Sequence, residues 1–275
     1  MVAAGLALPL AGVVHAAVPA IDGSGSNGCY SSSGSCTASI TVTTTQSNDW
    51  IYFVLAYGYS AGPSAPTTPT ATGLTFNARC TLTSATNNLY VNTYYALAST
   101  AGAYSITAGT GASKNTATMV AFGVSGADSS NPFDRNLGSC AAGSFATTAT
   151  SQSDSASTTG TADLVVGFLG AAAGSSGQTV TSGSTLVTTA TVVHGSANYY
   201  LASAEYSTTT SSGTQQQSYT LSASPAPVES TMGIDAFVTT AGIPVFPYGV
   251  LPLLAAVTLV MYFLKVRGAQ RPRPS

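Results

Sequence analysis

The sequence is poor in charged residues. Asp, Glu, Lys and Arg together make up 6% of its 275 residues, against about 25% in an ordinary soluble domain. Helical bundles and coiled coils need charged helix faces, and nucleic-acid-binding proteins need a basic surface. The composition argues against both classes, and we expect no nucleic-acid partner. Apolar residues still make up 44% of the chain, which is enough to build a buried core.

Residues with catalytic chemistry are also scarce. Of the two histidines, only His194 lies beyond the N-terminal apolar stretch, so a Ser-His-Asp triad would have to use it. A glycoside hydrolase needs two carboxyl groups about 5 to 10 Å apart, and no motif forces any two to converge. The candidates are Asp128, Asp134, Asp154, Asp163, Glu205, Glu229 and Asp235. We therefore predict no catalytic residues, no cofactor and no bound metal, and a secreted hydrolase is the weakest function considered.

The few charges are unevenly placed. All nine acids lie between Asp22 and Asp235, where three bases oppose them, so this stretch has a net charge of −6. Residues 245–264 form a run of twenty residues without a charge, and a helix of this length spans the roughly 30 Å core of a bilayer. Four bases follow this run: Lys265, Arg267, Arg271 and Arg273. The run predicts a C-terminal transmembrane helix, and the bases predict a cytoplasmic C-terminus. A buried core helix is the alternative.

The N-terminus has the pattern of a secretion signal. Residues 3–14 are apolar, and Val14 and Ala16 are small residues at the −3 and −1 positions of a cleavage site after Ala16. No Lys or Arg precedes the apolar stretch, which departs from the usual signal. Together with the C-terminal span, this predicts a single-pass type I membrane protein with residues 17–242 outside the cell.

Export also accounts for the four cysteines, Cys29, Cys36, Cys80 and Cys140. An even number in an exported chain indicates disulfides, and four cysteines allow three connectivities. A flexible Ser/Gly-rich stretch separates Cys29 from Cys36, which favours pairing these two and leaves Cys80 with Cys140.

Short apolar segments fill the rest of the chain, and none keeps the 3.6-residue period of a helix. Residues 50–57 form a continuous apolar run, as in a central strand that is buried on both faces. In 89–97, Leu89, Val91 and Tyr95 share one face, and Tyr94 lies on the other. Other candidate strands are 40–42, 104–106, 119–124, 164–169, 186–193, 199–206, 219–221 and 234–238. The pattern predicts an all-β fold, a single jelly-roll-like β-sandwich of about eleven strands.

Serine and threonine supply the polar surface of this sandwich. The chain has 37 Ser and 40 Thr, and β-branched Thr suits the solvent face of a strand. Their hydroxyl groups are also potential sites of O-glycosylation.

A weak internal repeat crosses the middle of the chain. Asp49 and the apolar run after it parallel Asp163 and the run after it, and Tyr95 parallels Tyr206. The two halves are either tandem domains or parts of one sandwich, and we favour one domain. The predicted organisation is a signal peptide (1–16), a disulfide-closed segment (17–37), a sandwich (38–242, halves 38–140 and 162–242), a membrane helix (243–264) and a basic tail (265–275).

The segment 125–134 has a distinctive sequence between the halves. Its motif residues are Ser125, Gly126, Asp128, Asn131, Pro132 and Asp134. With the Asp-Leu-Val-Val-Gly stretch at 163–167, this turn resembles a group of uncharacterised secreted β-sandwich domains. The resemblance implies a fold and a surface location, and brings no catalytic residues. The oxygens of Asp128, Asn131 and Asp134 either bind Ca²⁺ or, as in most such runs, cap their own backbone.

The tail resembles the C-terminal sorting signals of archaeal surface proteins. Ile243-Pro244-Val245-Phe246-Pro247 precedes the apolar span and the short basic end. In those proteins a peptidase can remove the span and a lipid replaces it. The acidic residue usual in that motif is absent, Val245 standing in its place, so we expect a permanent anchor.

These features predict a membrane-anchored, non-catalytic extracellular protein with a structural, adhesive or cell-envelope role. Its expected partners are the membrane and surface glycans or other envelope proteins. Fourteen tyrosines, with adjacent pairs at 94–95 and 199–200, leave open a carbohydrate-binding module as the alternative. A filament subunit released by tail cleavage is a further variant, because Thr-rich edge strands can pair with other chains.

Overall fold

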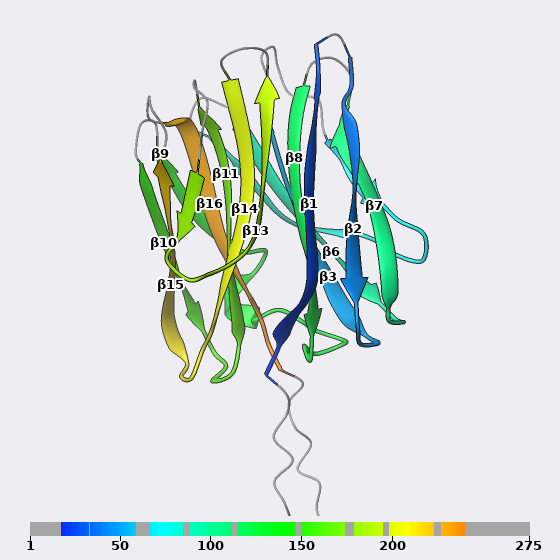
Figure 1. Ribbon diagram of the computed structural model, residues 1–275. Helices are drawn as coiled ribbons and strands as arrows, with labels where there is room; N and C mark the ends of the chain where they lie inside the picture. The colour runs from blue at the N-terminus through cyan, green and yellow to red at the C-terminus, as the bar shows by residue number, and fades with distance from the viewer. Residues whose placement is uncertain are drawn as a thin grey trace, which may run out of the picture. The chain divides into compact units, whose positions relative to one another are not determined.

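A computed structural model of the protein describes residues 18–32, 34–58, 66–84, 89–111, 115–146, 150–173, 179–194, 198–222 and 227–239. Residues Ala17–Thr240 form one compact unit, shown in Figure 1. The predicted signal, the predicted membrane span and the basic residues Lys265, Arg267, Arg271 and Arg273 lie outside the described residues. Within the described ranges, no helix has the length and apolar character needed to cross a membrane.

The prediction of an all-β fold is confirmed: antiparallel sheets build the unit as a β-sandwich. In the first half, one sheet has the order β1-β8-β3-β6-β5 and the other the order β2-β7-β4. The strands are β1 (Ala20–Ser31), β2 (Thr37–Thr44), β3 (Asp49–Gly58), β4 (Pro66–Thr70), β5 (Asn77–Thr83), β6 (Leu89–Ala98), β7 (Gly102–Thr110) and β8 (Asn115–Ser125).

The second half repeats this arrangement. Its five-stranded sheet, read from the other end, has the order β9-β16-β11-β14-β13, and its three-stranded sheet has the order β10-β15-β12. Adding eight to each strand number of the first half gives the same two orders. The strands are β9 (Ala141–Ala146), β10 (Ser151–Thr158), β11 (Leu164–Ala173), β12 (Thr179–Ser182), β13 (Thr185–His194), β14 (Asn198–Thr208), β15 (Gly213–Ser222) and β16 (Pro227–Phe237).

The strand register extends the repeat to single residues. On β3, Tyr52 lies opposite Tyr95 of β6, and on β11, Val166 lies opposite Tyr206 of β14. Strands β3 and β11 occupy the same place in their sheets, and Tyr52 and Val166 each lie three residues after the aspartate that starts the repeat. Tyr95 and Tyr206 are therefore at equivalent positions. The weak repeat in the sequence therefore corresponds to two eight-stranded halves within one compact unit.

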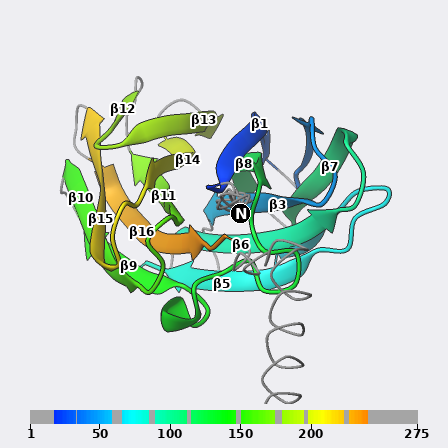
Figure 2. The ribbon, with the colours of Figure 1, turned by 90° about the horizontal axis from the view of Figure 1, so that it is seen from below.

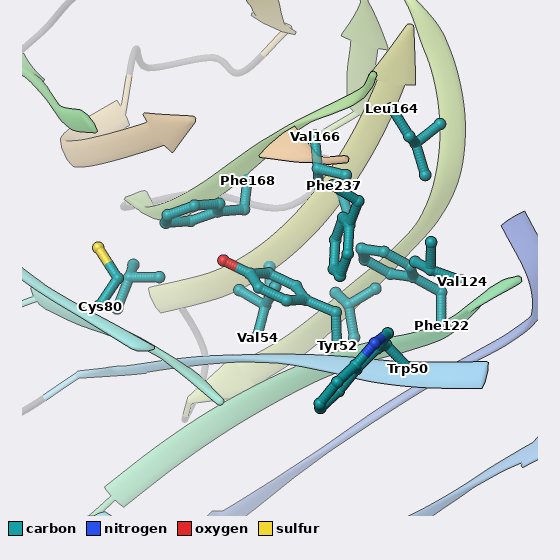
Figure 3. Close-up of a cluster of buried hydrophobic side chains, with 14 of the residues drawn as sticks. Trp50, Tyr52, Val54, Cys80, Phe122, Val124, Leu164, Val166, Phe168 and Phe237 are labelled. Atoms are coloured by element: carbon teal, nitrogen blue, oxygen red, sulfur yellow. The ribbon is translucent and has the colours of Figure 1, made fainter. Parts of the chain in front are cut away.

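The two five-stranded sheets face each other, and the three-stranded sheets lie on the outside (Figure 2). A shared core fills the space between the five-stranded sheets, with Tyr52 and Phe122 from the first half and Phe168 and Phe237 from the second (Figure 3). Each half has a second core between its own two sheets. Each buried aromatic or aliphatic side chain of this size contributes about 1.5 to 3 kcal/mol.

Strand β3 is buried on both faces, as its continuous apolar run predicts. Ile51 and Phe53 pack into the core of the first half, whereas Tyr52 and Val54 pack into the shared core. The alternation predicted for β6 is also confirmed, since Tyr95 packs on the shared core and Tyr94 on the other.

The described residues contain sixteen strands, whereas about eleven were expected and ten candidate ranges were given. The additional strands β1, β4, β5, β9, β10 and β12 are short or rich in Gly, Ser, Thr and Pro, so they carry no apolar run. Strand β1 pairs with β8 and passes close to β2. Added Cβ atoms at Gly23 and Gly25 would lie 2.0 and 2.4 Å from the carbonyl oxygens of Thr43 and Thr41 on β2. Glycine suits such a strand because it permits close backbone approach.

Candidate functional site

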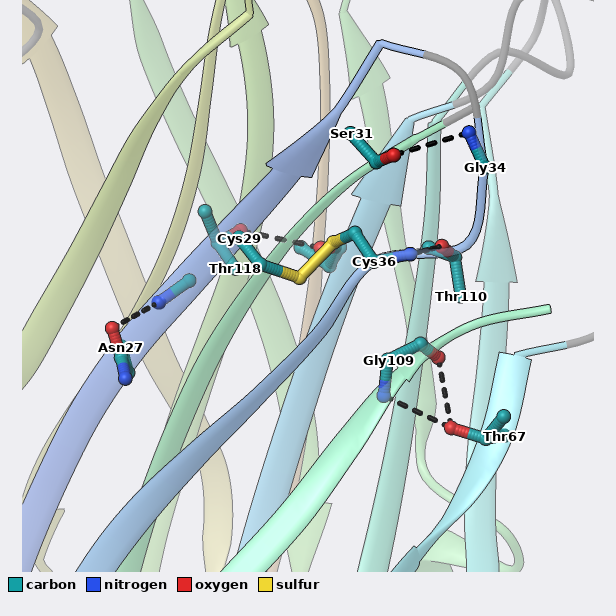
Figure 4. Close-up of a disulfide and its surroundings, with 11 residues drawn as sticks. Asn27, Cys29, Ser31, Gly34, Cys36, Thr67, Gly109, Thr110 and Thr118 are labelled. Atoms are coloured by element: carbon teal, nitrogen blue, oxygen red, sulfur yellow. Dashed lines mark hydrogen bonds between the residues drawn. A yellow bond between two sulfur atoms is a disulfide. The ribbon is translucent and has the colours of Figure 1, made fainter. Parts of the chain in front are cut away.

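The first disulfide closes the turn between β1 and β2. Cys29 and Cys36 are bonded, with their Cα atoms 5.7 Å apart (Figure 4). The Cys36 N–H donates to Thr110 Oγ1 over 3.2 Å, and the Gly34 N–H donates to Ser31 Oγ over 3.1 Å. The pairing favoured from the spacing is the one present. The disulfide ties β1 to the start of β2, and the Cys36–Thr110 hydrogen bond holds that start against the end of β7.

The second disulfide joins the two halves. Cys80 of β5 is bonded to Cys140, which directly precedes β9, with a Cα separation of 5.9 Å. Beside it, Arg79 of β5 forms a bidentate ion pair with Asp235 of β16. The ring of Phe133 lies under the guanidinium, 3.9 Å from Arg79 Cζ. A covalent bond and a buried ion pair therefore connect the halves at one edge of the shared core.

The segment 125–134 runs along the end of β16. Asp128 N–H donates to Val238 O and Asp134 N–H donates to Ala236 O, over 3.0 and 2.9 Å. Asp128 Oδ1 accepts the N–H groups of Ser130 and Asn131, over 2.7 and 3.0 Å. Asp128 therefore caps its own turn, the more frequent of the two alternatives for this motif, and its carbonyl oxygen accepts Trp50 Nε1–H over 2.8 Å.

Asp134 has a different role in the same segment. Its Oδ1 accepts the Asn136 N–H over 2.8 Å at the start of the short 3₁₀ helix Arg135–Leu137, and its Oδ2 accepts the Thr159 hydroxyl over 2.8 Å. Among the residues described, no group of three or more His, Cys, Asp or Glu side chains is placed to hold a metal ion.

Asp134 and Asp163 form a buried pair of carboxyl groups, each about 1% exposed. Burial, together with the carboxylate of Asp134, raises the pKa of Asp163 to about 6. Burial also opposes ionisation of Asp134, but hydrogen bonds from Thr159 and Asn136 outweigh it and lower the pKa of Asp134. One carboxyl group of the pair therefore tends to keep its proton while the other is ionised.

The first half contains the same pair. Asp22 Oδ2 accepts the Thr45 N–H over 2.6 Å and the Gln46 N–H over 3.2 Å, as Asp134 accepts from Thr159. Burial, with the Asp22 carboxyl beside it, raises the pKa of Asp49 to about 7, whereas hydrogen bonds overcome burial and lower the pKa of Asp22. Asp22 and its pairing with Asp49 were not predicted from the sequence. The available signal was the repeated spacing Thr-x-x-x-Asp at 45–49 and 159–163.

Asp154 Oδ1 accepts the N–H of the next residue, Ser155, over 2.8 Å. Three other carboxyl groups considered for catalysis have separate structural partners. Asp235 pairs with Arg79, Glu229 accepts the Ser84 hydroxyl over 2.9 Å, and Glu205 accepts the Ser218 N–H over 2.8 Å. His194 ends β13 opposite Asn198, and its side chain is outside the described set. The tyrosine pair at 94–95 faces two cores, so neither ring offers a free stacking surface.

Two glycine patterns in the sequence have the spacing of known motifs but not their structural context. Gly23-x-Gly25-x-x-Gly28 has the spacing of a dinucleotide-binding turn, but it lies inside strand β1 rather than between a strand and a helix. Gly58-x-Ser60-x-Gly62 has the spacing of a nucleophile elbow. An elbow leads into a helix, whereas the next described element is strand β4, and Ser60 lies outside the described residues.

A hollow of about 740 Å³ opens where the start of β1 meets the β12–β13 turn and the end of β14. Its walls include Ile21, Ser184, Thr185, Tyr206, Ser207 and Thr208. This volume lies in the range of small-molecule sites, about 300 to 1,000 Å³.

Comparisons of the chain with protein-family models, curated proteins and solved structures gave no match.

Proposed function

We propose that this protein is a membrane-anchored, non-catalytic extracellular module with a structural or adhesive role. The observation that supports it best is the connection between the halves, where Cys80–Cys140, the Arg79–Asp235 pair and the shared core meet. Such a unit resists separation of its halves, as a load-bearing or protease-exposed surface protein requires.

The extracellular location is proposed from redox chemistry and from the sequence. Disulfides persist in oxidising compartments and are rare where thiols are kept reduced. Both cysteine pairs are bonded, and no free cysteine remains in the described part of the chain. The apolar run 245–264 and the bases after it support a single-pass anchor with a cytoplasmic end.

The strand pairing supports a jelly-roll origin for each half. A jelly roll has eight strands in two sheets, and the first half places β1, β8, β3 and β6 in one sheet and β2, β7 and β4 in the other. Strand β5 joins the larger sheet. We propose two fused jelly-roll-like halves in place of the single one expected from the sequence.

Protease treatment of intact host cells tests the location. We expect external protease to release or degrade the domain 17–240 while a cytoplasmic marker protein stays intact, and the same protease to reach both after lysis. A domain that is protected until lysis would overturn the proposal.

Intact mass of the protein from its own membranes tests the processing steps. We expect loss of residues 1–16 and a gain of about 4 Da on reduction, two hydrogens for each disulfide. Additional loss of the span 243–264 would replace the permanent anchor with enzymatic sorting and favour the filament variant.

A further inference from the structure

The hollow occupies one of two equivalent places in the duplicated fold. Ile21 of β1 lies opposite Val124 of β8, and Phe133 lies opposite Phe237 of β16. Val124 pairs with Trp50 of β3, and Phe237 pairs with Leu164 of β11, at equivalent positions of the two halves. Ile21 and Phe133 are therefore equivalent, as are Tyr206 and Tyr95.

The place beside Tyr95 is filled. The Phe133 ring packs edge-on against Tyr95, with centroids 4.9 Å apart. Arg79 covers the other side of Phe133, and its guanidinium is neutralised by Asp235. Phe133 and the Arg79–Asp235 ion pair therefore fill the space on this side of the shared core.

The place beside Tyr206 has uncharged residues at the corresponding positions. The edge strands β5 and β13 each contain one residue that has no partner in the strand register. This residue is Arg79 on β5 and Val187 on β13. Opposite Tyr52, β8 carries Phe122, whereas β16 carries Asp235 opposite Val166. Beside Tyr206, Val187 therefore stands at the position that Arg79 has beside Tyr95. In the same way Phe122 stands at the position of Asp235, and Ile21 at that of Phe133. Within the described part of the chain, no aromatic ring packs against Tyr206, and the hollow of about 740 Å³ lies here.

The walls of the hollow combine an aromatic ring with hydroxyl groups. Tyr206 and Ile21 are apolar surfaces partly buried on the shared core, and no charged side chain is among the residues that line the hollow. Thr185, which lies opposite Tyr206 on β13, and Thr208, two residues further along β14, place hydroxyl groups on the same face as Tyr206.

Buried side chains fix two parts of this wall. The Ser184 N–H donates to Glu205 Oε2 over 3.3 Å, and the Gly183 N–H donates to Ser218 O over 2.7 Å, which holds the β12–β13 turn. Gln217 Nε2 donates to Ser207 Oγ over 2.7 Å on the opposite face of β14, which holds the strand that carries Tyr206. Preorganised polar groups lower the entropic cost of binding.

We propose that this hollow binds a neutral saccharide. The apolar face of a sugar ring stacks on Tyr206, and sugar hydroxyls exchange hydrogen bonds with the side chains of Thr185 and Thr208. An uncharged wall favours a neutral sugar over an acidic one, because it offers no cation to a carboxylate or sulfate. Saccharides are abundant outside cells, so this inference extends the proposed surface role. Its evidence is the hollow alone, and it does not depend on where the protein is located.

Binding is tested on the full-length protein in detergent. The probes are an array of neutral mono- and oligosaccharides built from glucose, galactose, mannose and N-acetylglucosamine, with sialylated and sulfated sugars as charged comparisons. We expect a neutral sugar to be retained, and its affinity is then measured by calorimetry. The assay uses purified protein, so its result is independent of where the protein lies in the cell.

Three variants assign the binding to the hollow. Ile21→Phe introduces the ring that Phe133 supplies at the equivalent place, so it covers the face of Tyr206 on which the sugar stacks and abolishes binding. Tyr206→Ala weakens binding by roughly tenfold or more, the loss expected for one stacking contact. Tyr95→Phe at the filled place leaves affinity unchanged, and thermal unfolding checks that each variant is folded.

Several outcomes would overturn the proposal. The protein could retain no neutral sugar, it could bind the charged sugars more tightly, or folded Ile21→Phe could bind the neutral sugar with unchanged affinity. Competition by laurate, tested on the same protein, would assign the hollow to an aliphatic chain instead.

Discussion

Arg79 and Asp235 join the two halves of the domain by a bidentate ion pair in which both N–O distances are 2.7 Å. The carboxylate is fully buried, and the guanidinium side chain is 10% exposed. Burial raises the pKa of Asp235, and Arg79 opposes that shift. Tyr52 adds a hydroxyl donor to Asp235 Oδ2 over 3.2 Å. Both of these partners come from the first half, and the N–H of the neighbouring Ala236 also donates to Asp235 Oδ1, over 3.0 Å.

Arg79→Met is expected to destabilise the domain by about 3 to 5 kcal/mol, because it leaves the buried Asp235 carboxylate without its cation. The double variant Arg79→Met/Asp235→Leu recovers most of this loss, since two apolar side chains of similar volume need no compensation. Urea unfolding of the two variants measures the difference. Equal destabilisation in both would show that the pair acts through packing rather than charge.

The two disulfides are expected to differ in their effect on stability. Cys80–Cys140 closes a loop with a sequence separation of 60, and Cys29–Cys36 one with a separation of 7. In the chain-entropy model these loops correspond to about 4 and about 2 kcal/mol. Denaturation midpoints of Cys80→Ala/Cys140→Ala and Cys29→Ala/Cys36→Ala test the order, and a larger loss in the second variant would contradict the model.

The strands that the sequence predicted are those with an apolar run or a clear alternation. Strand β3 belongs to the first kind because it is buried on both faces, and β6 to the second. Strand β1 was missed because its hydrogen bonds to β8 and its contacts with β2 are made by backbone and glycine. Sequence periodicity reports side-chain burial, so it does not detect such strands.

The candidate sites were predictable to a smaller extent. Proximity in sequence indicated the Cys29–Cys36 pair. Asp163 was a candidate, but its pairing with Asp134 depends on how the connecting segment lies along the end of β16. The hollow was not predictable, because it arises where Ile21 stands at the position equivalent to Phe133, and this equivalence follows only from the strand register.

Gly58→Ala is expected to destabilise the protein by about 1 to 3 kcal/mol through overpacking. A Cβ atom at Gly58 would lie 1.7 Å from Cε1 of Tyr200, so the ring would have to move. Gly34→Ala is the matched control, because the nearest atom to its added Cβ is Ser31 Oγ at 3.7 Å. Thermal unfolding compares the two, and equal melting temperatures would argue against close packing of Tyr200 on β3.

The duplicated carboxyl pairs make stability depend on pH. The pKa values of Asp49 and Asp163 are raised to about 7 and about 6, whereas an unfolded Asp titrates near about 3.9. Between these values the folded protein holds protons that the unfolded chain has released, so folding becomes less favourable as pH rises. The contribution of these two protons to folding stability is complete below about pH 4. It is lost once Asp49 and Asp163 have ionised in the folded protein.

Stability is therefore expected to fall between pH 4.5 and about 7.5, and Asp49→Asn is expected to reduce this fall. An asparagine side chain donates a hydrogen bond to Asp22 as the protonated acid does, but it carries no charge at any pH. Asp22→Asn provides the contrast: it removes a carboxylate oxygen that accepts the N–H groups of Thr45 and Gln46, so it destabilises the protein even at pH 4.5. Urea midpoints at the two pH values measure both effects. An unchanged pH dependence in Asp49→Asn would mean that Asp49 is already ionised in the folded protein at pH 4.5, and that the two carboxyl groups share no proton.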